Sequence, residues 1–192
     1  MKPDSKSLKK TAQRPPPPVE TPPLPPEATG LPAPLTVAGA MNTDWINLDL
    51  RGADRDTVLR ELVALLIPAS EPHWQETLFQ ALKAREDLCS TCIDEGVAIP
   101  HSRNALVGLV EHPQLAYGRH RAGLGFGAFD GKPVQHFFLL CAPNVREHLQ
   151  LLARLARLVK EPQLRAQLLA ADQPAQVLAA IAATETKLRF PS

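Results

Sequence analysis

One short stretch of this chain passes from an apolar run into a proline and then a histidine, Glu95-Gly96-Val97-Ala98-Ile99-Pro100-His101. Pro100 fixes its own φ and disfavours helical geometry at Ile99. A short apolar run that ends in this way is typical of a buried strand. We therefore expect His101 at a strand end, where a rigid element holds it and the loops leave it accessible.

Apolar periodicity predicts helices before and after a group of strands. Extended segments are expected at 46–50, 96–99, 114–118, 124–129 and 135–141. Helices are expected from Asp54 to about Pro68, and over about 73–89, 144–160, 162–171 and 174–183. This order predicts the α/β class, with a mixed β-sheet sandwiched by α-helices in a single domain.

The first 42 residues have a different composition from the rest of the chain. Of the 20 prolines, 11 fall within the first 34 positions, and lysine and arginine recur near the start. Such a segment favours polyproline II and cannot bury a core. We therefore expect a disordered, basic, proline-rich tail over residues 1–42 and a folded domain over residues 43–192.

Charge and cysteine usage exclude several classes of function. Lys and Arg total 21 against 20 Asp and Glu, so neither nucleic acid nor an anionic membrane is an expected partner. No apolar run approaches the roughly 20 residues that span a bilayer, so direct membrane insertion is not expected. Three cysteines, an odd number, favour a reducing, cytoplasmic location. Cys89 and Cys92 form a CxxC pair, but only Cys141 remains as a further thiol, so we expect no metal and no cofactor.

The apolar run and its flanking residues resemble the active-site signature of a known family. Besides the heptad, the likeness includes Arg85-Glu86, Ser90-Thr91, Asp130-Gly131-Lys132-Pro133-Val134 and His148-Leu149. Together these residues resemble enzyme IIA proteins of the phosphoenolpyruvate-dependent phosphotransferase system, in the fructose, mannitol and nitrogen-regulatory (type 2) branch. The likeness covers roughly residues 45–188, and it implies the same α/β sandwich.

The resemblance implies a role for each site residue. His101 would be the phosphoryl acceptor, Arg85 the positioning cation and His148 the second active-site histidine. The Thr91 hydroxyl could reach the same phosphoryl oxygens, or it could simply lie at a helix end. Many relatives have glycine after the active histidine, whereas this chain has Ser102, which could alter how closely a phosphate approaches.

The chemistry of these residues suits the roles that the resemblance implies, although without the resemblance each of the three would more simply be an ordinary surface or core residue. Neutral imidazole is nucleophilic near physiological pH, and a phosphoramidate is labile enough to pass its phosphoryl group on. If Asn144 and Glu147 form a capping box, His148 lies in the first turn of a helix, where the positive dipole end disfavours imidazolium. A neutral His148 could then donate an N–H to a phosphoryl oxygen. The guanidinium of Arg85 could clamp such an oxygen.

Two functions follow as hypotheses. In the first, the protein is a phosphotransferase-type phosphoryl carrier with a phosphohistidine intermediate. It would receive phosphate on His101 from a histidine-containing phosphocarrier protein. It would then pass the phosphate to a permease IIB component or use it as a regulatory switch. The nitrogen-regulatory type is favoured because no IIB sequence accompanies the domain. The alternative is a non-catalytic regulatory binding module on the same fold, suggested by Ser102 and the tail.

Overall fold

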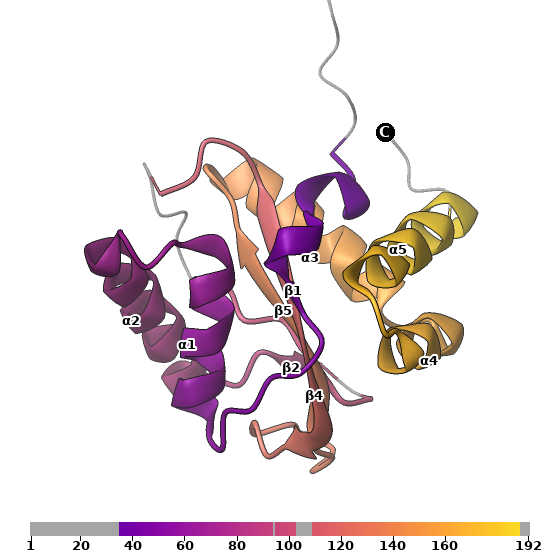
Figure 1. Cartoon of the computed structure of the whole chain (residues 1–192), viewed down its shortest axis with the longest axis horizontal. Coiled ribbons are helices and arrows are strands. Elements are labelled where there is room, and N and C mark those ends of the chain that lie inside the picture. The colour runs from indigo at the N-terminus through magenta and orange to yellow at the C-terminus, as the bar shows by residue number, and fades with distance from the viewer. Residues whose placement is uncertain (1–34, 94, 103–108, 189–192) are drawn as a thin grey trace, which may run out of the picture. The chain divides into compact units, whose positions relative to one another are not determined.

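A five-stranded mixed sheet forms the centre of the domain (Figure 1). The computed structural model describes residues 35–93, 95–102 and 109–188. The sheet has the order β1-β4-β5-β3-β2, with β1 parallel to β4, β3 parallel to β5, and the other two pairs antiparallel. The strands are β1 (Ile46–Asn47), β2 (Cys92–Ile93), β3 (Val97–Ala98), β4 (Gln114–Leu124) and β5 (Val134–Cys141).

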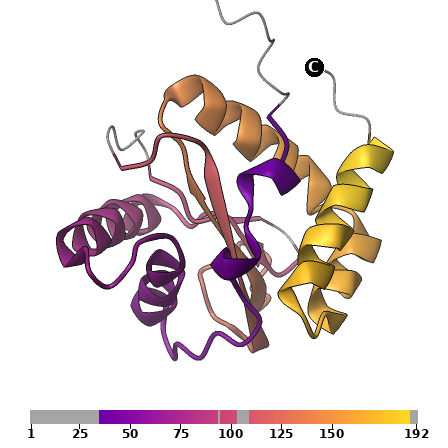
Figure 2. The same ribbon diagram turned by 45° about the horizontal axis from the view of Figure 1, so that its top comes forward.

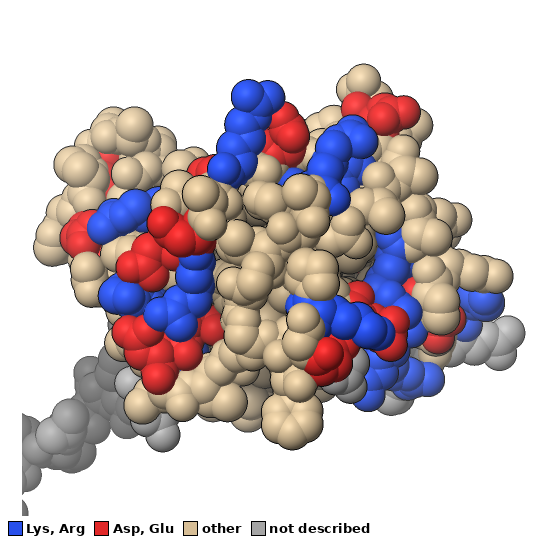
Figure 3. Space-filling view, turned by 90° about the horizontal axis from the view of Figure 1, so that it is seen from below, with Lys and Arg blue, Asp and Glu red and all other residues tan. Residues whose placement is uncertain are grey.

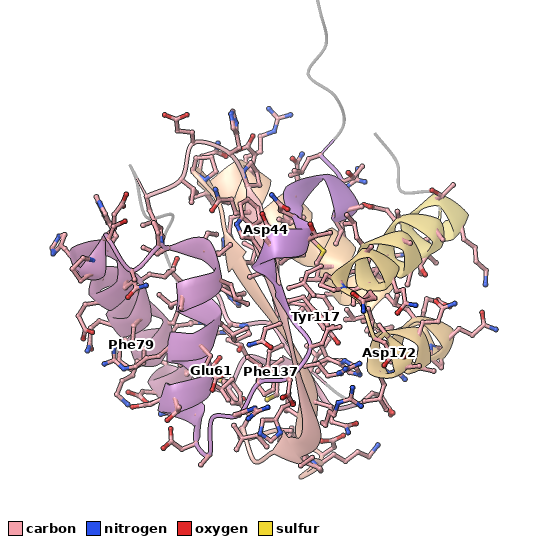
Figure 4. The ribbon with its side chains drawn as sticks, in the orientation of Figure 1. Asp44, Glu61, Phe79, Tyr117, Phe137 and Asp172 are labelled. Atoms are coloured by element: carbon pink, nitrogen blue, oxygen red, sulfur yellow. The ribbon has the colours of Figure 1, made fainter. Side chains whose placement is uncertain are left out.

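Helices cover both faces of the sheet, as the sequence predicts (Figures 1 and 2). One face carries α1 (Arg55–Leu66) and α2 (Pro72–Leu88). The other carries α3 (Val145–Leu158), α4 (Pro162–Ala170) and α5 (Pro174–Leu188). Two apolar clusters therefore lie on opposite sides of the sheet. Figure 4 shows Tyr117 on the α5 side and Phe137 on the α1 side.

The central strand β5 is buried on both faces, which explains its nearly continuous apolar sequence. Phe138 and Leu140 pack in the cluster with α3, α4 and α5, whereas Phe137 and Leu139 pack in the cluster with α1 and α2. This alternation follows from the two-residue period of a strand. The α/β class and the mixed, sandwiched sheet are confirmed.

The starts of two helices are set by side-chain caps. The Asp54 carboxylate accepts the backbone N–H of Thr57 at 2.8 Å. Asp54 is thus the N-cap of α1, which begins at Arg55. Asn144 accepts the N–H of Glu147 at 3.0 Å, and the Asn144 amide donates to the Glu147 carboxylate at 2.8 Å. Both helix starts agree with the sequence-based expectation.

The expected strand at 124–129 is wrong. Instead β4 continues to Leu124, and the chain then leaves the sheet through Gly127, whose φ of 78° is left-handed. Phe126 turns back onto the sheet, where its ring meets Phe137 edge-on with centroids 5.1 Å apart. The apolar residues that resemble a strand therefore fill the α1 and α2 side of the core.

The expected tail boundary at residue 42 is also placed too late. Val37 is fully buried, and Met41 is 8% exposed within the cluster that contains α5. The Glu185 carboxylate of α5 accepts the backbone N–H of Val37 at 2.7 Å and that of Ala38 at 3.1 Å. Residues 35–41 thus belong to the folded domain. The rest of the expected tail, residues 1–34, lies outside the described residues.

Charges of both signs are interspersed on the face seen in Figure 3. This distribution agrees with a formal net charge of +1 for the whole chain. Within the described part of the chain, no helix is long and apolar enough to cross a membrane.

Candidate functional site

His101 lies just beyond β3, at the expected strand end. Pro100 accepts the backbone N–H of Leu140 at 3.0 Å, and His101 forms an isolated parallel bridge with the same residue of β5. The backbone of the histidine is therefore tied to the central strand of the sheet. Its side chain is only partly buried, so it is both fixed and accessible.

The hydrogen bond of the His101 ring selects one tautomer. Nδ1 lies 2.7 Å from the carbonyl oxygen of Ile99. A carbonyl only accepts, so in this contact Nδ1 carries the proton and the lone pair of the neutral ring lies on Nε2. Burial lowers the pKa of His101, and the positive charge of Arg85 lowers it further. The neutral, nucleophilic form therefore predominates at neutral pH.

His148 lies beside His101, as predicted. It is in the first turn of α3, where its backbone N–H donates to the carbonyl of Asn144 at 3.1 Å. The two imidazole centroids are 5.3 Å apart, with planes inclined by 56°. Burial lowers the pKa of His148, and His101 adds to the effect. A neutral His148 can therefore present an N–H donor next to the acceptor nitrogen.

Arg85 supplies a positive charge to the same site from the last turn of α2. Its Nη1 donates to the carbonyl of Cys89 at 2.6 Å, just past the end of that helix. The positive charge of Arg85 acts on His101, whose pKa it lowers. The structure thus places His101 and His148 side by side, and Arg85 adds a positive charge that acts on His101.

Of the two readings that the sequence leaves open for Thr91, the structure favours the hydroxyl at a helix end. Its side chain is buried, and its hydroxyl donates to the carboxylate of Glu86, which also accepts the Thr91 backbone N–H. The single hydroxyl proton is therefore used within the protein and does not face an incoming phosphoryl oxygen. Sequence reasoning assigned no role to Glu86, although the Arg85-Glu86 pair was part of the resemblance. The sequence did carry one signal, because Glu86 falls on the buried side of an amphipathic helix, where a carboxylate is rarely found unless it is paired.

Ser102, which stands where many relatives have glycine, is accommodated without backbone strain. Among the described non-glycine residues only Glu95 has a positive φ, so the backbone at Ser102 is one that any residue adopts. The serine is 6% exposed.

The cysteine thiols and the His136 ring take no part in the contacts described for this site. Cys89 is exposed, whereas the Cys92 thiol is half-buried 3.5 Å from the carbonyl of Phe126, and burial raises the pKa of Cys92 to about 11. In the described residues no group of three or more His, Cys, Asp or Glu could hold a metal ion. His136 is buried against the Tyr117 hydroxyl at 2.8 Å, in the core.

A neutral histidine with a free nucleophilic nitrogen, a second histidine and a guanidinium together suit the capture of an anionic electrophile. The chain belongs to the family described as the phosphoenolpyruvate-dependent sugar phosphotransferase system, EIIA 2, whose model matches residues 40–184. It is therefore a IIA protein, of the phosphoryl-carrier or the nitrogen-regulatory kind.

The relatives include both sugar-specific components and nitrogen regulatory proteins. The chain is 36% identical over 121 residues to a nitrogen regulatory protein of Pseudomonas aeruginosa, covering 62% of this chain and 76% of the relative. It is 31% identical over 140 residues to the fructose-specific EIIABC component of Bacillus subtilis, covering 72% of this chain but only 22% of that protein.

A solved structure agrees with the sequence comparison. The nitrogen regulatory protein IIA-Ntr of Neisseria meningitidis is 33% identical and superposes with a TM-score of 0.66, covering 76% of this chain and 98% of that one. The likeness therefore extends over nearly the whole of a solved IIA protein.

Proposed function

We propose that this protein accepts a phosphoryl group on Nε2 of His101 from a histidine-containing phosphocarrier protein. The observation that carries the proposal is the 2.7 Å hydrogen bond from Nδ1 to Ile99, which leaves Nε2 as the nucleophile. In the transfer, the new bond from Nε2 to phosphorus forms as the nitrogen–phosphorus bond of the donor breaks. The donor imidazole keeps the electron pair of that bond, and the proton on Nδ1 of His101 stays in place.

The other two residues of the site stabilise the charge. The phosphoryl group brings negative charge next to Arg85, whose Nη1 is already held by the Cys89 carbonyl, so little side-chain freedom is lost on binding. The His148 ring adds a neutral donor beside it. Pre-set donors of this kind contribute most where charge develops in the transition state.

The onward use of the phosphoryl group is proposed to be regulatory. The identity to the nitrogen regulatory protein, 36%, exceeds the 31% identity to the fructose component, and the solved relative at 33% is also nitrogen regulatory. Transfer to a permease IIB component is the competing fate. A non-catalytic binding module is disfavoured because His101 keeps a nucleophilic nitrogen beside His148 and because Ser102 causes no strain.

The deciding experiment is incubation of the purified protein with phosphoenolpyruvate, the general phosphotransferase enzyme and the phosphocarrier. We expect the mass of one phosphoryl group to be added, in an acid-labile linkage that maps to His101. An unmodified protein would leave the binding module as the better account. Adding a IIB component then separates the two fates, since loss of the label to IIB would contradict a purely regulatory role.

Replacing His148 with alanine should slow transfer without abolishing it. The acceptor nitrogen remains, but one donor to the phosphoryl group is lost, which raises the barrier by about 2 to 4 kcal/mol. His148→Gln, which restores an N–H donor, should recover part of the rate. Gln150→Ala, an exposed change on the same helix, is the control. Wild-type uptake and donation by the alanine variant would make His148 a bystander.

The pH dependence of phosphoryl uptake should distinguish the effect of the positive charge of Arg85 from the effect of its planar guanidinium. Because the pKa of His101 is lowered, the neutral nucleophile should persist below the ordinary histidine pKa of roughly 6.5. Arg85→Ala removes one cause of the lowered pKa of His101. The pH below which uptake fails should therefore rise towards the ordinary histidine pKa. Arg85→Lys keeps the charge but loses the planar guanidinium, so the rate should fall with little change in the pH below which uptake fails. Rate measurements across pH on both variants provide the test, and identical profiles in all three proteins would remove Arg85 from the site.

A further inference from the structure

A buried carboxylate lies directly behind the site. Glu86 is in the last turn of α2, next to Arg85 in sequence, and is 3% exposed. Its two oxygens accept the backbone N–H of Thr91 at 3.0 and 3.3 Å, and one of them also accepts the Thr91 hydroxyl. Burial of a carboxylate is costly unless its oxygens are hydrogen-bonded, so this pairing fixes Thr91 against the end of the helix.

Thr91 connects this carboxylate to the histidine through the backbone. The carbonyl of Thr91 accepts the N–H of Ile99 at 3.1 Å. The carbonyl of the same Ile99 accepts Nδ1 of His101 at 2.7 Å. Each link leads to the next without an exposed or flexible side chain between them. Displacement of Thr91 would therefore move the carbonyl that sets the ring orientation and the tautomer of His101.

The same loop also holds the cation. Cys89, two residues before Thr91, provides the carbonyl that accepts Nη1 of Arg85 at 2.6 Å. Ser90, between them, donates its hydroxyl to the carbonyl of Phe126 at 2.9 Å and accepts the N–H of Cys92 at 3.2 Å. The segment 89–91 thus contacts both Arg85 and the backbone that carries His101.

We propose that Glu86 is a positioning residue, which holds segment 89–91 so that Arg85 and Nε2 of His101 face one phosphoryl group. The expected effect on kcat rests on the proposed phosphoryl transfer. The expected effect on the tautomer of His101 does not. Glu86 does not touch the reacting atoms. A small displacement of reacting groups costs up to about a hundredfold in rate, which is why such support matters.

The amide variant Glu86→Gln is the sharpest change, because it keeps the volume of the side chain. The glutamine has only one acceptor oxygen, and its NH₂ would face a Thr91 donor, so one donor is left without an acceptor. Asp87→Asn is the matched control, since the chemical change is the same one residue later. Asp87 pairs instead with Arg55 and with Lys83, the latter at 3.7 Å.

The first measurement is geometric and needs no phosphoryl donor. Imidazole ¹⁵N NMR at about pH 8, above the ordinary histidine pKa of roughly 6.5, reports which nitrogen of His101 carries the proton. We expect nearly complete Nδ1 protonation in the wild-type protein and in Asp87→Asn. In Glu86→Gln we expect a mixture of tautomers. A simple loss of stability would leave the tautomer of the folded protein unchanged.

The second measurement is kinetic and uses the phosphocarrier as substrate. Glu86→Gln should lower kcat by about tenfold to a hundredfold with KM nearly unchanged, because the surface that meets the carrier is not altered. If the amide variant does not fold, Thr91→Val should show the same changes to a smaller degree, since it removes the hydroxyl and keeps the N–H. An unchanged tautomer together with an unchanged kcat, in whichever variant folds, would overturn the proposal. If the wild-type protein takes up no phosphate, the proposed function fails, and the NMR result still decides the role of Glu86.

Discussion

Replacing His101 with alanine is expected to abolish phosphoryl uptake while leaving the fold intact. No other described histidine combines a fixed tautomer with a neighbouring guanidinium and a second imidazole. The backbone bridge to β5 survives, because the 3.0 Å hydrogen bond joins the N–H of Leu140 to the carbonyl of Pro100. The melting temperature should therefore stay within a few degrees of the wild type. Mass spectrometry after incubation with the donor system and thermal circular dichroism provide the two readings.

The control for this substitution is His73→Ala. His73 is exposed near the start of α2, far along that helix from Arg85, and its loss should leave uptake unchanged. Retention of full uptake by His101→Ala would show that another side chain is the acceptor. Loss of uptake in both variants would point to a general effect of the substitutions instead.

The fold was largely predictable because its signals are local. Asp54 and Asn144 mark helix starts through caps that span three residues, and apolar periodicity marks the helices behind them. The failures occur where local signals compete. The residues after Leu124 have strand-like composition, yet left-handed glycines take them out of the sheet, and Phe126 then packs on Phe137. Only the packed core shows whether these residues form a strand or a loop that covers the sheet.

The site was predictable in its main residues and not in its support. Arg85, His101 and His148 belong to sequence patterns that resemble a known family, so no contact information was needed to group them. The pairing of Glu86 with Thr91 depends on the direction in which two side chains point at the end of α2. The sequence left two readings of the Thr91 hydroxyl open, and the hydrogen bond to Glu86 favours the one at a helix end. A sequence pattern does not specify that direction.

The N-terminal boundary was misplaced for a related reason. Proline-rich composition extends to Pro34, and the next few residues show neither strand nor helix periodicity. They fold as a short 3-10 helix, Ala38–Ala40, next to the buried Val37. The backbone N–H of Val37 donates to the Glu185 carboxylate, which is 148 residues away in sequence. Contacts over such a separation leave no local signal.

Two truncations should therefore differ strongly in stability. Removal of residues 1–33 takes away only proline-rich sequence, for which we expect little change in melting temperature. Removal of residues 1–42 also deletes Val37 and Met41, whose burial contributes about 1.5 to 3 kcal/mol each. It leaves Glu185 without two N–H donors, at a further cost of about 1 to 3 kcal/mol. Part of this loss is offset because residues 35–41 no longer have to be ordered.

We expect the longer truncation to lower the free energy of unfolding by roughly 3 kcal/mol, which for a domain of this size is a fall of about 6 to 12 °C. Thermal and urea unfolding of the two truncated proteins measure it. Glu185→Gln in the full chain should reproduce part of the loss, because an amide offers one acceptor oxygen to two N–H donors. Equal stability of the two truncations would mean that residues 35–41 cover the core without stabilising it. Failure of the longer truncation to fold would show that the domain requires the segment that contains the buried Val37 and Met41.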